Sequence, residues 1–76
     1  MSPHFPALTY RDLAALARDR GFVLWRTAKG SHEIWKNLAT GRRTVIPNHG
    51  SQTIKRKTVK SILEDLGVDP QTLMGP

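Results

Sequence analysis

Two short segments carry the residues best suited to chemistry, and each contains a histidine. Gly30-Ser31-His32 stands just before the apolar pair Ile34-Trp35, and Pro47-Asn48-His49-Gly50 begins fifteen residues after His32. A histidine that follows a Gly-Ser turn is expected at the mouth of a strand, with its ring facing solvent. Histidine has an unperturbed pKa of ~6.5, so it gives or takes a proton near neutrality. His32 is therefore the first candidate for acid–base chemistry.

The composition is that of one small basic domain. The chain has 76 residues, 38% of them hydrophobic, and a net charge of +6. This charge indicates an anionic partner, either nucleic acid or an acidic protein. No apolar run approaches the ~20 residues that span a bilayer, and the N-terminus lacks a basic segment followed by an apolar one. We therefore expect no membrane segment and no secretory signal, and the lack of cysteine fits a cytoplasmic location.

The first half of the chain predicts one helix followed by three strands. A helix is expected to start near Thr9 and to run to about Arg20, because Thr9 and Asp12 have the spacing of a capping box and Gly21 is a left-handed stop. Turn residues then separate three runs rich in apolar and β-branched residues. The predicted strands are 22–27, 32–37 and 43–47. Short connections between them predict an antiparallel meander.

The last part of the chain predicts a second helix and a short final turn. Its apolar stripe, at helical spacing, consists of Val59, Ile62, Leu63 and Leu66. Gly67 ends this helix, and Asp69-Pro70 can cap a last turn. The order α-β-β-β-α predicts an α+β fold, a three-stranded antiparallel sheet with both helices on one face. We divide the chain into a flexible N-terminal extension (1–7), a domain (8–68) and a short C-terminal tail (69–76).

Four cations crowd the first turns of the second predicted helix: Lys55, Arg56, Lys57 and Lys60. Unpaired N–H groups at a helix start act as roughly +0.5 of an elementary charge, so each cation costs on the order of 0.3–1 kcal/mol. The placement is understandable if an anion docks there, because free N–H groups and basic side chains then converge on it. A solvated charged face is the alternative. Because the helix dipole opposes the placement, we favour phosphate binding. Double-stranded RNA binding domains share the α-β-β-β-α order and use a basic start of the last helix in this way.

Four segments in matching order carry a resemblance to a known family: Arg20-Gly21-Phe22, Lys29-Gly30-Ser31-His32, Val45-Ile46-Pro47-Asn48-His49-Gly50 and Thr58-Val59-Lys60-Ser61-Ile62-Leu63. Together they resemble the HicA family, small toxins of bacterial and archaeal toxin–antitoxin pairs, over roughly Leu8 to Val68. The resemblance implies a fold like that of a double-stranded RNA binding domain, cleavage of messenger RNA and neutralisation by a HicB-like antitoxin. The family's catalytic histidine follows the Gly-Ser turn and falls on His32.

From the residues alone, His32 is either a catalytic side chain or one that merely ends a turn. With the resemblance, the predicted function is a metal-independent endoribonuclease in which His32 is the general acid or base. The alternative is a non-catalytic RNA-binding module of the same fold. The predicted RNA contacts are Lys29, His49, Lys55, Arg56, Lys57 and Lys60. His49 can instead be a partner acid, and the loop around it can equally be only a shaped turn.

Neither a metal nor another cofactor is predicted. His32 and Glu33 are neighbours on opposite faces of a strand, and the sequence has no histidine pair or carboxylate cluster at metal-ligand spacing. Trp25 and Trp35 have the chemistry to stack on bases, as aromatic residues do in single-strand binding. For both, a half-buried position covering the sheet is the favoured alternative.

Overall fold

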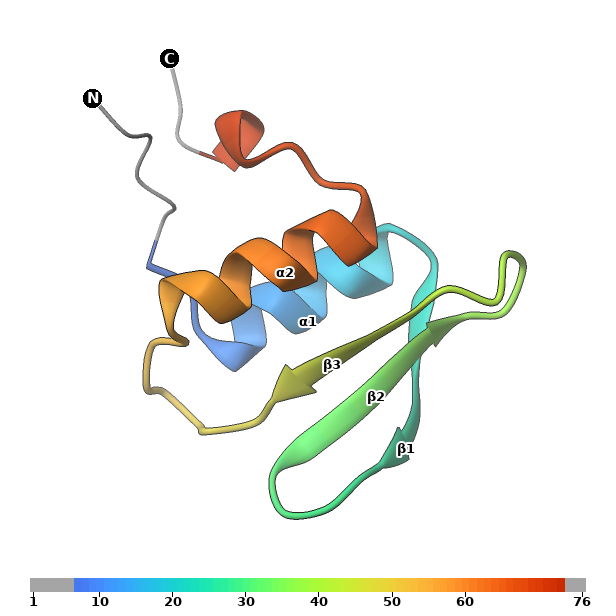
Figure 1. Ribbon diagram of the computed structural model, residues 1–76, viewed down its shortest axis with the longest axis horizontal. Helices are drawn as coiled ribbons and strands as arrows, with labels where there is room; N and C mark the ends of the chain where they lie inside the picture. Colours follow the sequence, from blue (N-terminus) through green and yellow to red (C-terminus); the bar gives the residue numbers. More distant parts are fainter. Residues whose placement is uncertain (1–6, 74–76) are drawn as a thin grey trace.

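The structure is a computed structural model that describes residues 7–73. Its elements in chain order are α1 (Tyr10–Asp19), β1 (Phe22–Thr27), β2 (His32–Asn37), β3 (Arg43–Pro47), α2 (Arg56–Leu66) and a final 3₁₀ helix (Pro70–Leu73) (Figure 1). The predicted order and all three predicted strands are confirmed. The predicted N-terminal extension lies outside the described residues except for Ala7, and so does the end of the predicted tail, 74–76.

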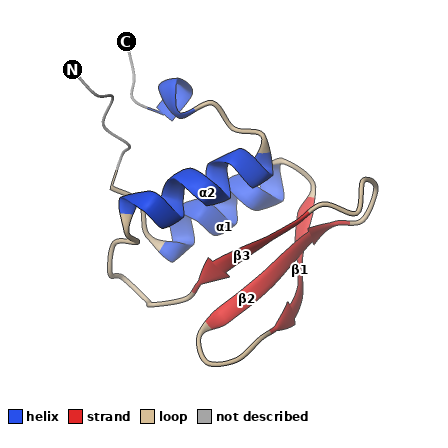
Figure 2. Ribbon diagram, viewed as in Figure 1, coloured by secondary structure: helices blue, strands red, loops and turns tan. Residues whose placement is uncertain are grey.

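The three strands form one antiparallel sheet in the order β1-β2-β3, so β3 is an edge strand. Short turns between consecutive strands produce this meander, as predicted. Both helices lie on the same side of the sheet, which confirms the predicted layering (Figure 2). The opposite side, called here the open face, has no helix over it within the described chain.

The core lies between the two helices and the covered face of the sheet. Its largest fully buried side chains are Trp35, Leu13, Ile46, Ile62, Leu63 and Val59. The predicted stripe of α2 is buried in full. On the first helix Leu13, Ala14 and Ala17 are buried, and Leu16 is partly buried against the core.

Local signals account for both ends of α1. The Thr9 hydroxyl accepts a hydrogen bond from the Asp12 N–H at 3.4 Å, and the Thr9 N–H donates to Asp12 Oδ2 at 3.0 Å. This is the predicted capping box. The helix ends at Asp19, one residue before the predicted end, and Gly21 has the left-handed φ of 85° that lets the chain turn into β1.

The first strand contains an irregularity that the sequence did not predict. Leu24 pairs with Trp35, but the next pair is Arg26 with Ile34, so Trp25 has no cross-strand partner. An extra residue of this kind is a β-bulge, which locally bends and twists its strand. Because of the extra residue, Arg26 pairs with Ile34 and lies on the same face as Val23 and Trp25 instead of on the opposite one.

Candidate active site

The two histidine-containing segments lie side by side at one end of the sheet. His32 opens β2 and is the register partner of Pro47, the last residue of β3. Beyond this pair, the Asn48 N–H donates to the Ser31 carbonyl at 2.8 Å. The antiparallel hairpin therefore brings together two segments that are fifteen residues apart in the sequence.

A cleft of about 470 Å³ opens at this junction. Its lining residues come from the start of β2, the end of β3, the loop after β3 and the start of α2: His32, Val45, Pro47, His49, Gln52, Thr53, Ile54, Lys55 and Thr58. We call it the His32 cleft. The imidazole of His32 is exposed, and none of these lining residues is acidic. The cleft therefore offers a proton carrier beside a cation in a concave surface, which suits an anionic substrate.

The loop from Asn48 to Lys55 is fastened at both ends, which holds His49 near His32. At its start, Asn48 Oδ1 accepts from the Gly50 N–H at 3.3 Å, and Gly50 has a left-handed φ of 66°. At its end, Ile54 is buried in the core and its N–H donates to the Leu8 carbonyl at 2.8 Å. The loop is thus a shaped turn, which is one of the alternatives that the sequence left open for His49. It also places His49 on the wall of the His32 cleft.

Glu33 supports this loop from the far side of β2. Its Oε2 accepts from the Asn48 side-chain amide at 3.3 Å, while its Oε1 is buried without a hydrogen-bond partner. Tyr10 lies close to Glu33. The pKa of the Tyr10 phenol is raised, mainly by burial and secondly by the Glu33 carboxylate. Glu33 therefore faces the helices while His32 faces the cleft, as the alternation of a strand requires.

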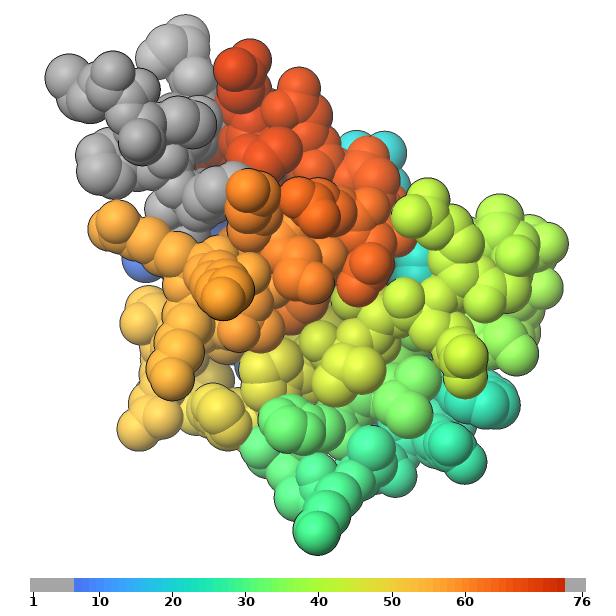
Figure 3. All heavy atoms as spheres, in the orientation of Figure 1, coloured from blue at the N-terminus to red at the C-terminus, as the bar shows by residue number. Residues whose placement is uncertain are grey.

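The predicted basic residues divide between the cleft and the surrounding surface. Lys55 lines the cleft, immediately before the first residue of α2. The remaining predicted contacts are exposed but do not line it: Lys29, Arg56, Lys57 and Lys60. The start of α2 has no side-chain cap and no acidic residue in its first turn, so its N–H groups stay available to an anion. Figure 3 shows the orange start of α2 bordering the yellow loop after β3 on one surface.

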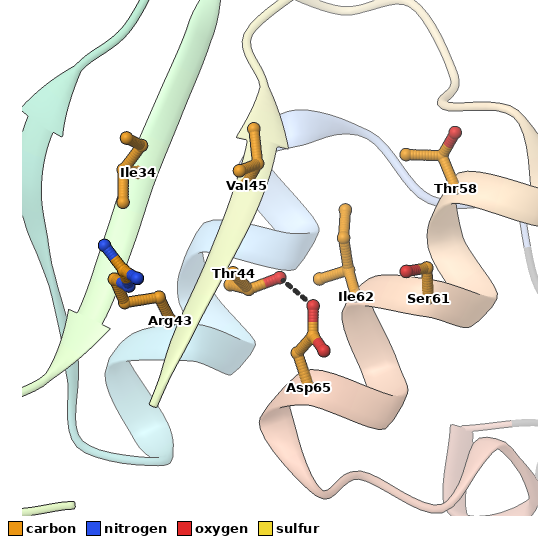
Figure 4. A pocket seen from close by; sticks show the side chains of 8 residues that line it. All are labelled: Ile34, Arg43, Thr44, Val45, Thr58, Ser61, Ile62 and Asp65. Carbon is orange, nitrogen blue, oxygen red and sulfur yellow. Dashed lines mark hydrogen bonds between the residues drawn. The ribbon is translucent and has the colours of Figure 1, made fainter. Parts of the chain in front are cut away.

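A second hollow of about 480 Å³ continues from the His32 cleft along β3 and α2. Val45 and Thr58 line both. At its far end the Thr44 hydroxyl donates to Asp65 Oδ2 at 2.9 Å, which joins the edge strand to α2 (Figure 4). Sequence reasoning missed this hollow, because it depends on how α2 packs against β3 and not on any local motif.

The two tryptophans have different environments. Trp35 is 1% exposed, within the core, and its ring lies 5.1 Å from the Arg18 guanidinium carbon, measured to the ring centroid. The prediction of a half-buried Trp35 was wrong, and its burial excludes base stacking. Trp25 is exposed, at 42%, so the half-buried position predicted for it is wrong as well.

Residues 7–73 show neither a group of metal ligands nor a membrane-spanning helix. No group of three or more His, Cys, Asp or Glu side chains in that range is placed to hold a metal ion. Within the same range, no helix has the length and apolar character needed to cross a membrane.

The fold and the cleft define a class: a small basic α-β-β-β-α domain with a cleft lined by two histidines. Residues 10–68 match the sequence model of the HicA toxin of bacterial toxin–antitoxin systems. Because this match covers most of the chain, the protein belongs to the HicA toxin family. No curated protein and no solved structure matches the chain significantly.

Proposed function

We propose that this member of a toxin–antitoxin family is a metal-independent endoribonuclease that cleaves messenger RNA. The observation that carries the proposal is the His32 cleft, where an exposed histidine lies at the mouth of β2 in a concave site with Lys55 and His49. An endoribonuclease needs a proton carrier and cations close together, because RNA is a polyanion that carries its own nucleophile.

In the proposed mechanism the 2′-hydroxyl oxygen of the RNA attacks the adjacent phosphorus, and the bond to the 5′-oxygen of the next nucleotide breaks. His32 acts as the base that takes the 2′-hydroxyl proton or as the acid that protonates the leaving oxygen, and water takes or gives the other proton. Either role contributes about 10²–10⁴-fold to the rate. Lys55 stabilises the developing negative charge on the phosphate. The products are a 2′,3′-cyclic phosphate and a 5′-hydroxyl.

A non-catalytic RNA-binding module of the same fold is the alternative function. The basic start of α2 would serve it equally well, since phosphate contacts alone give binding. The exposed His32 favours the enzyme, because a module that only binds has no need of a titratable group in its cleft.

Membership of a toxin–antitoxin family implies an antitoxin partner. We propose that this partner is an acidic, HicB-like protein that covers the His32 cleft in the cytoplasm. Opposite charges speed such an encounter, and the chain supplies the positive side with its net charge of +6.

Induced expression of the chain in a bacterial host tests the proposed function. We expect growth arrest and shortened messenger RNA when the chain is expressed alone. We expect normal growth when a HicB-like protein encoded beside it is expressed as well. Normal growth and intact messenger RNA in both cultures, with the chain present at equal levels, would contradict the proposal.

Replacing Lys55, Arg56 and Lys57 together with Ala should weaken RNA binding across all sequences. Phosphate contacts position a strand without reading it, so no new sequence preference is expected. Each lost contact should reduce the dependence of single-strand affinity on salt by about 0.7 log units per log of salt. The measurement is the affinity for an oligonucleotide that lacks 2′-hydroxyls, at several salt concentrations.

A matched control removes the same charge elsewhere. Arg11, Arg20 and Arg42 are exposed and lie outside the His32 cleft, so replacing all three with Ala should change the salt slope less. If both triple variants keep the wild-type slope, the start of α2 is only a solvated charged face.

A further inference from the structure

The open face of the sheet carries a cluster of one aromatic ring and three cations, drawn from all three strands. The Trp25 ring centroid lies 4.6 Å from Lys36 Nζ and 4.9 Å from the guanidinium carbon of Arg26. The guanidinium carbon of Arg43 lies 6.0 Å away. We call these four residues the Trp25 cluster. Despite its three neighbours, the indole keeps 42% of its surface exposed.

The register explains why these residues meet. Lys36 is the cross-strand partner of Arg43, and Val23 is the partner of Lys36, so all three occupy the face opposite Trp35. Trp25, two residues after Val23, alternates onto the same face, and the bulge brings Arg26, the partner of Ile34, onto it as well. The cluster is therefore fixed by backbone pairing and not by chance contacts of long side chains.

The charges of the cluster are not balanced from within the sheet. The three strands, all of which are described, contain one acidic residue, Glu33, and its carboxylate lies on the helix side, near Tyr10. A cation over an exposed aromatic ring is attracted to it, but three cations around one ring also repel one another. An anion bound at this face would relieve the repulsion.

An exposed apolar surface accompanies the cations. Val23 and Val45, which are 44% and 46% exposed, lie on the open face with Trp25. A flat aromatic ring bordered by cations matches a nucleotide better than it matches an acidic protein surface, because a nucleotide offers a planar base and a phosphate together. Base stacking on aromatic residues of an open sheet is an established way of binding unpaired RNA.

The open face is continuous with the His32 cleft. His32, Ile34 and Lys36 alternate along β2 and so share this face, with Lys36 about 13 Å from His32 at the usual strand rise. Val45, the register partner of Ile34, lines the cleft itself. An RNA strand bound at His32 therefore has a direct path across Ile34 and Val45 to the Trp25 cluster.

We propose that the Trp25 cluster binds an unpaired nucleotide of a single-stranded RNA, with its base stacked on the indole and its phosphates contacted by Arg26, Lys36 and Arg43. The inference rests on the proposed function, because it assigns the substrate class as unpaired RNA and adds a second binding position outside the His32 cleft. Duplex RNA would not bind this way, since its bases are already stacked.

The test is the affinity of Trp25→Ala for a single-stranded oligonucleotide without 2′-hydroxyls. Loss of one base–aromatic stack should weaken binding about five- to 150-fold. Trp25→Phe, which keeps an aromatic face, should recover most of that affinity. Leu38→Ala is the matched control, because Leu38 is an exposed apolar side chain in the turn after β2. It should bind as the wild type does.

A second readout identifies the stacked base. Oligonucleotides that each lack one base are compared on the wild type and on Trp25→Ala. One missing base should weaken wild-type binding by the same factor as the substitution, and should have no further effect on the variant. Thermal melts of all variants check that the fold is kept.

The outcomes separate this inference from the proposed function. If the wild type cuts RNA but Trp25→Ala binds it as tightly, the inference fails alone. If binding depends on Trp25 while no RNA is ever cut, the inference stands and the enzyme proposal fails. Unchanged RNA affinity together with lost binding of the antitoxin would make the open face a protein-docking surface and overturn the inference.

Discussion

His32→Ala is expected to slow RNA cleavage by about 10²–10⁴-fold, the usual contribution of a positioned general acid or base. The melting temperature should stay close to that of the wild type, because the side chain is exposed and contributes nothing to the core. RNA affinity should also be kept, since the cations around the cleft remain. The measurement is the single-turnover rate on a defined single-stranded RNA, together with the affinity for an uncleavable analogue.

His49→Ala is the matched control, since His49 lines the same cleft. If His49 contacts RNA without carrying protons, this variant should bind less tightly but cleave at the wild-type rate when RNA is saturating. Wild-type cleavage by a folded His32→Ala protein would remove His32 from the mechanism. Equal and large rate losses in both variants would instead indicate that the two histidines share the acid and base roles.

Trp35→Ala is expected to remove a large part of the free energy of unfolding. Replacing a buried Trp with Ala typically costs about 3–5 kcal/mol, through lost burial and the cavity left behind. At about 0.05–0.15 kcal/mol per residue, a domain of 76 residues has about 4–11 kcal/mol of stability, so this loss is a large part of the total. Thermal or urea unfolding followed by circular dichroism measures the change.

Trp25→Ala is the natural comparison for this stability measurement. The same chemical change at a 42% exposed position should shift the unfolding transition far less than Trp35→Ala does. If Trp35→Ala melts within a few degrees of the wild type, the indole does not hold the sheet to the helices as the structure indicates.

These two residues also show where sequence reasoning stops. Four apolar residues in succession, Phe22 to Trp25, give no alternation, so the sequence does not say which of them face the core. The bulge then shifts the alternation after Trp25, so that Arg26 joins Val23 and Trp25 on the open face, which no local signal encodes. The environment of each tryptophan can therefore be seen only in the folded sheet and not in the sequence.

The elements themselves were predictable because their signals are local. The capping box at Thr9 and Asp12 and the left-handed glycines at the helix ends act within a few residues of each boundary. The same holds for the second helix, whose apolar spacing alone predicts its buried side. Short connections then leave an antiparallel meander as the simplest arrangement of the three strands.

The candidate site was predictable only in part. The sequence singled out the segments around His32 and His49, and the hairpin register places them together. The Trp25 cluster was missed, because Arg26, Lys36 and Arg43 are scattered along three strands and form no run of charge. Their shared face would have been visible from alternation once the register and the bulge were known.

The chemistry of the cut ends tests the central claim most directly. Purified protein is incubated with a defined RNA in excess EDTA, and the product ends are identified by mass spectrometry. Attack by the 2′-hydroxyl with His32 as acid or base predicts 2′,3′-cyclic phosphate and 5′-hydroxyl ends, and no cut where that one 2′-hydroxyl is replaced by hydrogen. Products with 3′-hydroxyl and 5′-phosphate ends, or cleavage that stops in EDTA and returns with a divalent ion, would contradict the account.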